Sequence, residues 1–273
     1  MKKQTLIHFM ALGSLAASAQ NKWNSEPYLT KALSKSAIKD VFVRTSGGSI
    51  VVDGVAPGEA RIEVYINSGD GRDNLSKAEL EQRLKGNYTL EITDNNHELH
   101  ATAKSKSNLN WSKSLSISFK VYVPKAVSTN LSTSGGSLKL SQLKGKINAT
   151  TSGGSINADH IAGDLSTSTS GGSINLTQID GGVDAATSGG GIYAQLNSVG
   201  KYVKLNTSAG DIDLSMPQQK GFNLNLKGNR VNTTLRGNFE GSKDKDRVEG
   251  KINGGGALVQ AYASSGSVNV KFE

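Results

Sequence analysis

Hydrophobic and polar residues alternate along most of the chain, which is the pattern of β-strands that bury one face. The alternation is most regular between residues 133 and 214, where glycine pairs interrupt it at even intervals. The pattern predicts that this region consists of strands and tight turns, and that each repeat unit reads strand, turn, strand, turn.

A hexapeptide close to Thr-Ser-Gly-Gly-Ser-Ile repeats every 18 residues in this region, with one later step of 20 residues and one isolated early copy. Units this short cannot bury their apolar face alone, so we expect them to stack as a β-solenoid with coils about 4.8 Å apart. A hexapeptide β-helix is excluded, because the apolar residues do not recur every six positions. The copies begin at Thr45, Thr133, Thr151, Thr169, Thr187 and Thr207, and the interior ladder is Leu138, Ile156, Ile174, Ile192 and Ile212.

The glycine pair predicts a corner, where glycine permits either a positive φ or a close approach of two backbones. The neighbouring Ser and Thr can hydrogen-bond the turn amides and stack on their copies in the next coil. An anion cradle would need a helix after the glycines, and a nucleophile would occur once beside a histidine. We therefore interpret the motif as structural.

The flanking regions predict a less regular β-rich structure. Residues 20–37 read as polar and irregular, and one short helix is expected over residues 77–85, opened by a Ser76–Glu79 capping box and ended by Gly86. Residues 215–250 are polar and lysine-rich, and Gly254–Glu273 are expected to form the closing coils. The strands predicted before the repeats cover residues 38–43, 49–52, 61–66, 88–93, 98–103 and 114–123.

The first residues have the layout of a secretory signal peptide. Lys2 and Lys3 precede an apolar run over residues 6–17, and Ala17-Ser18-Ala19 is a small-x-small cleavage site. About 12 apolar residues are too few for a transmembrane helix, which needs about 20. The sequence predicts an exported protein of the periplasm or cell surface, without an integral membrane segment after cleavage. The predicted organisation is a signal peptide (1–19), an N-terminal β-rich capping segment (20–124) and a β-solenoid with degenerate C-terminal coils (125–273).

The amino-acid composition excludes some classes of protein, and the net charge indicates which kinds of partner to expect. The chain has no cysteine, four prolines and 5% aromatic residues, which excludes disulfide scaffolds and proline-rich linkers. Removing the leader lowers the formal net charge from +8 to +6, because Lys2 and Lys3 are lost. An exported basic protein meets glycans and envelope proteins rather than nucleic acid, so those are the expected partners.

Candidate chemistry is sparse. The acidic residues of the repeats occupy different repeat positions and predict no catalytic carboxylate pair, and the three histidines after the leader predict no metal site. We expect no cofactor and no catalytic residue. These acids are Asp164, Asp180, Asp184, Asp211 and Asp213, and the histidines are His97, His100 and His160.

One patch combines lysines with a tryptophan and predicts a site for an anionic sugar. Lys104, Lys106, Trp111 and Lys113 are expected to lie in a Ser/Asn-rich hairpin loop before a strand. Lysines supply charge and the indole supplies a stacking surface. Tyr193 and Tyr202 are a second, lesser stacking platform, although Tyr202 can also be read as an inward-facing residue.

The combined features resemble a known family. A secreted leader, an early Thr-Ser-Gly-Gly-Ser-Ile at residues 45–50 and a strand ending in Phe119–Pro124 precede the run of repeats. This arrangement is similar to the bacterial "putative adhesin" domain family of unknown function, a relative of the head-GIN-domain adhesin-like proteins, over roughly residues 38–273. The resemblance implies a solenoid or β-helix fold at the cell envelope and brings no catalytic residue.

The sequence therefore predicts an exported, non-catalytic, adhesin-like scaffold that presents a repetitive β-solenoid face for binding. Two other functions stay open at this point. One is a polysaccharide-active β-helix lyase or hydrolase, which would need convergent carboxylates in a groove. The other is a periplasmic component of envelope-stress sensing.

Overall fold

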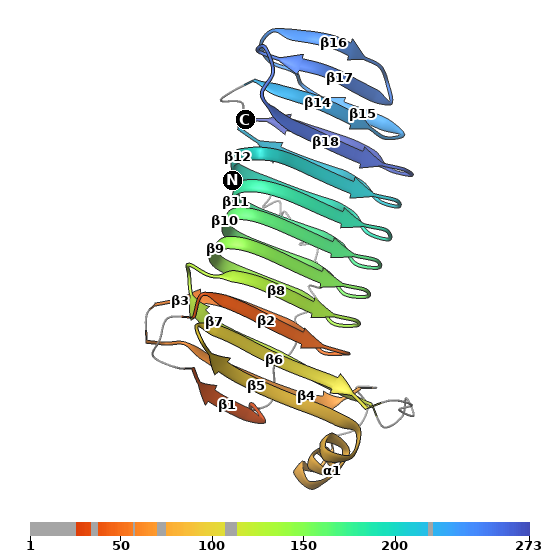
Figure 1. Cartoon of the computed structure of the whole chain (residues 1–273). Helices are drawn as coiled ribbons and strands as arrows, with labels where there is room; N and C mark the ends of the chain where they lie inside the picture. Colours follow the sequence, from red (N-terminus) through yellow and green to blue (C-terminus); the bar gives the residue numbers. More distant parts are fainter. Residues whose placement is uncertain (1–25, 34–37, 57, 70–74, 107–113, 218–220) are drawn as a thin grey trace, which may run out of the picture.

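The computed structural model of the chain describes residues 26–33, 38–56, 58–69, 75–106, 114–217 and 221–273. The predicted signal peptide lies outside these residues. Among the helices of the described segments, none is long and apolar enough to cross a membrane. The described strands form one elongated stack, with helix α1 at one end and strands β16 and β17 at the other (Figure 1). The predicted all-β, solenoid-like fold with one short helix is confirmed.

The repeat region forms coils that pair in parallel and in register. Ile156 lies opposite Leu138 on one side and Ile174 on the other, and all three side chains are buried. The predicted interior ladder is thus confirmed. The coils are β8 (Ser128–Thr133), β9 (Leu138–Thr151), β10 (Ile156–Thr169), β11 (Ile174–Thr187) and β12 (Ile192–Thr207).

Each full coil is one continuous strand that bends, rather than two strands joined by a turn as predicted. In β9, β10 and β11 the bend has left-handed backbone at one non-glycine residue, such as His160 (φ 53°), and at one glycine, such as Gly163 (φ 125°), whereas β12 bends without either. Pairing with the neighbouring coil continues on both sides of the bend, so the strand is not interrupted. We call the side formed by the residues before the bend face 1, and the side formed by the residues after it face 2.

The early copy of the motif is a coil of the same stack. Strands β2 (Asp40–Thr45) and β3 (Ile50–Val55) flank it, β2 pairing with β8 on face 2 and β3 with β9 on face 1. Beyond this coil, β6 (Glu98–Ser105) pairs with β2, and β7 (Leu115–Pro124) pairs with β3. Segments far apart in the sequence therefore alternate in the stack.

The N-terminal end is closed by the outermost strands and the helix. On face 2, β5 (Tyr88–Asn95) pairs with β6, and on face 1, β4 (Arg61–Ser68) pairs with β7 and with β1 (Leu29–Ala32). The prediction that residues 20–37 are irregular is wrong for β1, whose short polar sequence carries no alternating signal. Helix α1 (Lys77–Asn87) has the predicted capping box, but it extends past Gly86 to Asn87.

The C-terminal end differs from the prediction. Strands β18 (Ala257–Ala263) and β19 (Ser267–Phe272) lie inside the stack, against β12 and β13 (Ile212–Met216) respectively. The polar, lysine-rich segment forms the outermost strands at this end, and the charged side chains of these strands face outward. On the inner side of the segment, β14 (Phe222–Lys227) pairs with β18, and β15 (Arg230–Thr233) pairs with β19. Farther out, β17 (Arg247–Ile252) pairs with β14, and β16 (Phe239–Lys243) pairs with β17.

The corner motif joins neighbouring coils. Thr151 is buried, and its Oγ1 donates to Gly136 O over 2.8 Å and accepts from Gly154 N over 3.3 Å. A Cβ added at Gly154 would overlap the carbonyl of Gly136, and Gly154 does not have a positive φ. Of the two roles predicted for the glycine pair, close backbone approach is therefore the one that applies in this copy, whereas Gly210 in the last copy also has a positive φ of 133°. Ser155 N donates to Ser137 Oγ in the coil before it, which completes the structural role of the motif.

Candidate functional site

Outward-facing side chains on face 1 form ladders, because the register places equal repeat positions side by side. Asn175 Nδ2 donates to Asn157 Oδ1 over 3.0 Å, and Thr177 Oγ1 donates to Asp159 Oδ1 over 2.6 Å. The hydrogen bond from Thr177 is the main cause that holds the pKa of Asp159 below its ordinary value. The ladders therefore fix the orientation of the surface groups.

The first of these ladders runs from the repeat region into the C-terminal strands. Tyr193 on β12 takes the asparagine position and is 43% exposed. Toward the C-terminal end, the ladder continues through strands β13, β19 and β15 although these are not consecutive in the chain. Beyond Lys139 on β9, its members are, in spatial order, Asn157, Asn175, Tyr193, Asp213, Asn269 and Asn232.

A groove of about 740 Å³ lies over this part of face 1. We call it the Tyr193 groove. Strands β12, β13, β19 and β15 form its floor, and the end of β16 contributes Lys243. Its lining includes Tyr193, Asp213, Asn232, Asn269, Lys243 and Lys271.

Hydrogen bonds orient the polar groups of the groove. Asn232 Nδ2 donates to Asn269 Oδ1 over 2.7 Å, and Asn269 Nδ2 donates to Asp213 Oδ1 over 2.8 Å. The amide–amide–carboxylate chain settles which way both amides point. Lys271 Nζ pairs with Glu273 Oε1 over 3.0 Å at the edge of the groove.

A second group lies on face 2, around Tyr202. Gly182 has no side chain, and a Cβ there would lie 3.4 Å from the Tyr202 ring and 2.7 Å from an Asp164 oxygen. Burial, and then the nearby carboxylates of Asp164 and Asp184, raise the pKa of the Tyr202 hydroxyl. Tyr202 is half-buried on the outside of the coil, while Val203 faces the interior. It is therefore not an inward-facing residue.

The other acids of the repeats belong to ladders. The Asp180 carboxylate accepts hydrogen bonds from Ser198 Oγ over 2.9 Å and from Asn197 Nδ2 over 3.3 Å. Asp211 Oδ1 accepts from the backbone of Ser267 over 2.7 Å. These carboxylates contribute to the pairing of neighbouring coils.

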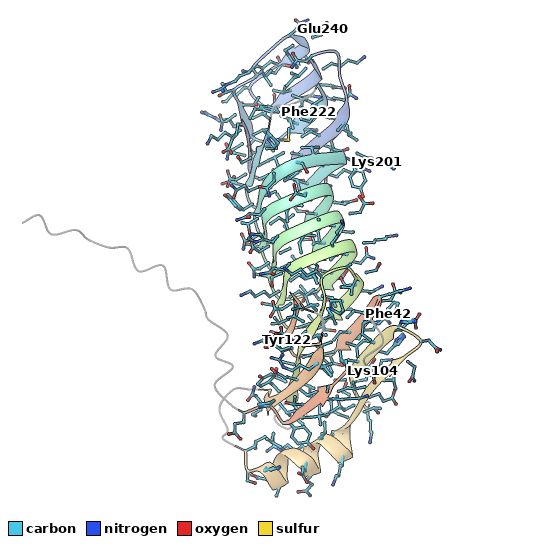
Figure 2. All side chains as sticks on the ribbon, turned by 90° about the vertical axis from the view of Figure 1, so that its left-hand side faces the viewer. Phe42, Lys104, Tyr122, Lys201, Phe222 and Glu240 are labelled. Atoms are coloured by element: carbon cyan, nitrogen blue, oxygen red, sulfur yellow. The ribbon has the colours of Figure 1, made fainter. Side chains whose placement is uncertain are left out.

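The predicted lysine–tryptophan patch is only partly described. Lys104 and Lys106 are exposed at the end of β6, and Lys106 Nζ donates to Lys85 O over 2.8 Å. Figure 2 shows Lys104 on the same side as Phe42, with Tyr122 on the opposite side. Trp111 and Lys113 lie outside the described residues. The expected hairpin is wrong, because β6 pairs with β2 and β5 while β7 pairs with β3 and β4 on the other face.

The histidines are accounted for by local contacts. His100 stacks on Phe42 with ring centroids 4.6 Å apart, and its Nε2 lies 2.9 Å from Glu98. His160 occupies the bend of its coil, where its Nδ1 lies 2.7 Å from Asp159. Among the described residues, no group of three or more His, Cys, Asp or Glu side chains is placed to hold a metal ion.

Sequence reasoning named Tyr193 and Asp213 but missed the groove, because Asn232 and Lys243 belong to the segment read as polar. The sequence nonetheless contains a pattern that indicates which strands line the groove. Val231-Asn232 and Val268-Asn269 repeat the apolar–asparagine pair of Ile156-Asn157 at the same inward and outward positions. This pair would have assigned β15 and β19 to face 1.

The comparisons with known proteins place the chain in a family. The model of the Toastrack DUF4097 family matches residues 112–271, which is more than half of the chain. The chain therefore belongs to the Toastrack family, a domain family of unknown function. No curated protein matches the chain.

Two solved structures align with most of the chain. One is described as a "putative cell adhesion protein" from Clostridium sporogenes; it is 14% identical, with a TM-score of 0.38 over 91% of this chain and 100% of its own. The other is described as a "putative adhesin" from Bacteroides fragilis; it is 10% identical, with a TM-score of 0.41 over 90% of this chain and 95% of its own.

Proposed function

We propose that this protein is an exported, adhesin-like scaffold of the cell envelope or surface, and that it acts by binding rather than by catalysis. In this proposal the repeat coils hold a long, regular face toward a glycan or an envelope protein. The interior supplies rigidity, and the outward ladders supply the contacts.

The observation that carries the proposal is the set of side-chain ladders on face 1. Asn157 and Asn175 bind each other rather than projecting freely, and Thr177 binds Asp159 in the same way. Groups held in place before binding lose less conformational entropy when a partner is bound. A face of this kind suits recognition of a partner that is itself repetitive.

The test is a pull-down from the native envelope with the purified chain lacking residues 1–19, together with turnover assays on a polysaccharide panel. We expect specific retention of a glycan or envelope protein and no hydrolysis or elimination product. Turnover on any polysaccharide that is lost in the Asp180→Ala or Asp184→Ala variant would overturn the proposal.

A polysaccharide-active enzyme is the second candidate, favoured by the group around Tyr202. Asp164 and Asp184 lie close enough to raise the pKa of the Tyr202 hydroxyl, so two carboxylates and a tyrosine share one site on face 2. If this site is catalytic, Tyr202→Phe and Asp164→Asn each abolish turnover in the same assays. If the protein is a scaffold, the two variants match the wild type in every assay.

A further inference from the structure

We propose that the Tyr193 groove binds a neutral glycan, with one sugar ring stacked on Tyr193 and its hydroxyls bound by Asp213, Asn269 and Asn232. The inference rests on the proposed binding function and names its ligand class and its site. Three observations carry it: an exposed aromatic ring, an oriented row of polar groups beside it, and a balance of charge.

The first observation is the position of Tyr193. Within the described part of the chain, Tyr193 and Leu29 are the large hydrophobic side chains more than a third exposed, at 43% and 39%. The ladder positions directly beside it carry Asn175 on one side and Asp213 on the other, so the ring stands in a polar surface. The C–H face of a pyranose ring packs against such a ring, while the phenol hydroxyl stays in water.

The second observation is the polar row that begins next to Tyr193. Asp213 is the direct neighbour of Tyr193 on β13, and Asn269 and Asn232 follow on the next two strands. One oxygen of Asp213 accepts from Asn269, and a carboxylate has lone pairs left for sugar hydroxyls. Neighbouring strands are about 4.8 Å apart, so the row offers hydrogen-bonding groups at roughly the width of a sugar ring.

The third observation is the charge of the lining. Lys243 and Lys271 are the basic side chains of the groove, and Asp213 and Glu273 are the acidic ones. Two positive and two negative side chains balance, and Lys271 and Glu273 also pair with each other. A polyanionic glycan stacked on Tyr193 would meet the Asp213 carboxylate directly beside the ring, so a neutral, hydroxyl-rich ligand fits better.

The test is binding of the purified chain lacking residues 1–19 to a panel of soluble oligosaccharides. The neutral members end in glucose, galactose, mannose or N-acetylglucosamine, and the acidic members contain uronic or sialic acid. We expect a neutral oligosaccharide to bind, Tyr193→Ala to weaken its affinity about tenfold or more, and Tyr193→Phe to retain it. Asn232→Ala removes one member of the polar row and is expected to weaken binding severalfold.

Tyr262→Ala is the matched control, because it removes an outward-facing tyrosine of β18 on face 2 and leaves the groove intact. Neutral-glycan binding that is unchanged in Tyr193→Ala, or reduced equally in Tyr262→Ala, overturns the inference and leaves the proposed scaffold function standing. Binding of acidic glycans alone, or of no glycan, also overturns it. The envelope pull-down decides separately whether the proposed function itself fails.

Discussion

A single threonine hydroxyl links each coil to the one before it. In the repeat region, Thr133, Thr151 and Thr169 each donate to a glycine carbonyl at 2.7–2.8 Å. The same oxygen accepts from the backbone of the second glycine of its own motif, at 3.3–3.4 Å. Serine would offer the same oxygen, but threonine is stiffer at χ1 and fills the interior with its methyl group. The corner position therefore requires a threonine, which supplies both the hydroxyl and the buried methyl group.

We expect Thr151→Val to lower the free energy of unfolding by about 1–3 kcal/mol. Valine has the same shape, but it leaves the carbonyl of Gly136 and the amide of Gly154 without the hydroxyl that binds both. Chemical denaturation followed by circular dichroism measures the change. Thr150→Val is the matched control, because Thr150 is exposed on face 2. Equal stability of the two variants would show that the buried hydroxyl does not matter.

At the scale of the element, the corner depends on the distance between stacked backbones. The two glycines of one motif differ sharply in this respect. A Cβ at Gly153 would lie 3.5 Å from its nearest neighbours, an ordinary contact, whereas a Cβ at Gly154 would overlap the carbonyl of Gly136. Neither glycine has a positive φ. Comparing alanine variants of the two glycines therefore measures how close backbone approach affects stability, because neither variant forces alanine into a positive φ.

Gly154→Ala is expected to destabilise the protein by about 1–3 kcal/mol, because the coils must move apart locally to admit the methyl group. Gly153→Ala is expected to stay within about 0.5 kcal/mol of the wild type. Thermal unfolding of both variants under identical conditions makes the comparison. If Gly153→Ala is the more damaging change, the role assigned to the second glycine is wrong.

The sequence predicted the coils because their period is visible in the chain, and the structure confirms the ladder from Leu138 to Ile212. It did not predict that each coil is continuous through its bend. The residues with left-handed backbone there include Gln142 and Gln178, whose side chains give no sign of a positive φ. Glycine at that position would have marked the bend, as the glycine three residues later does.

Local sequence patterns also explain why Tyr193 was predicted as part of a site while the groove beside it was not. Tyr193 was named as a lesser stacking surface because it is an aromatic residue on the irregular fourth coil of the repeats. The groove beside it depends on Asn269 lying next to Asp213, although 56 residues separate them. A pairing over that distance follows from the path of the whole chain, which local alternation does not specify.

At the scale of the whole molecule, both ends of the stack are closed by chain that leaves it and returns. Residues 222–252 form the outer strands after β13, and the chain then returns as β18 and β19 between those strands and the repeats. The N-terminal end is similar, since β6 and β7 lie outside β2 and β3 although they follow them in sequence. This interleaving covers the edges of the last repeat coils, which would otherwise be open to pairing.

Removing residues 222–252 and joining Gly221 to Asn253 should make the chain associate end to end, into particles of higher mass than the full chain forms. The deletion leaves the outer edges of β18 and β19 unpaired and exposes the end of the interior at Val259 and Ala261. An open edge of this kind pairs with other chains. Light scattering after size-exclusion chromatography measures the mass of the deleted and full chains.

Charge on the new edge provides the control for this experiment. Gln260→Lys and Tyr262→Lys change outward-facing residues of β18, and lysines on an edge strand oppose pairing with a second copy. Added to the deletion variant, they should restore the oligomeric state of the full chain if edge pairing causes the association. If the oligomers persist, exposed interior rather than the open edge holds the copies together. If the deletion variant keeps the oligomeric state of the full chain without them, the segment is not needed to cap the stack.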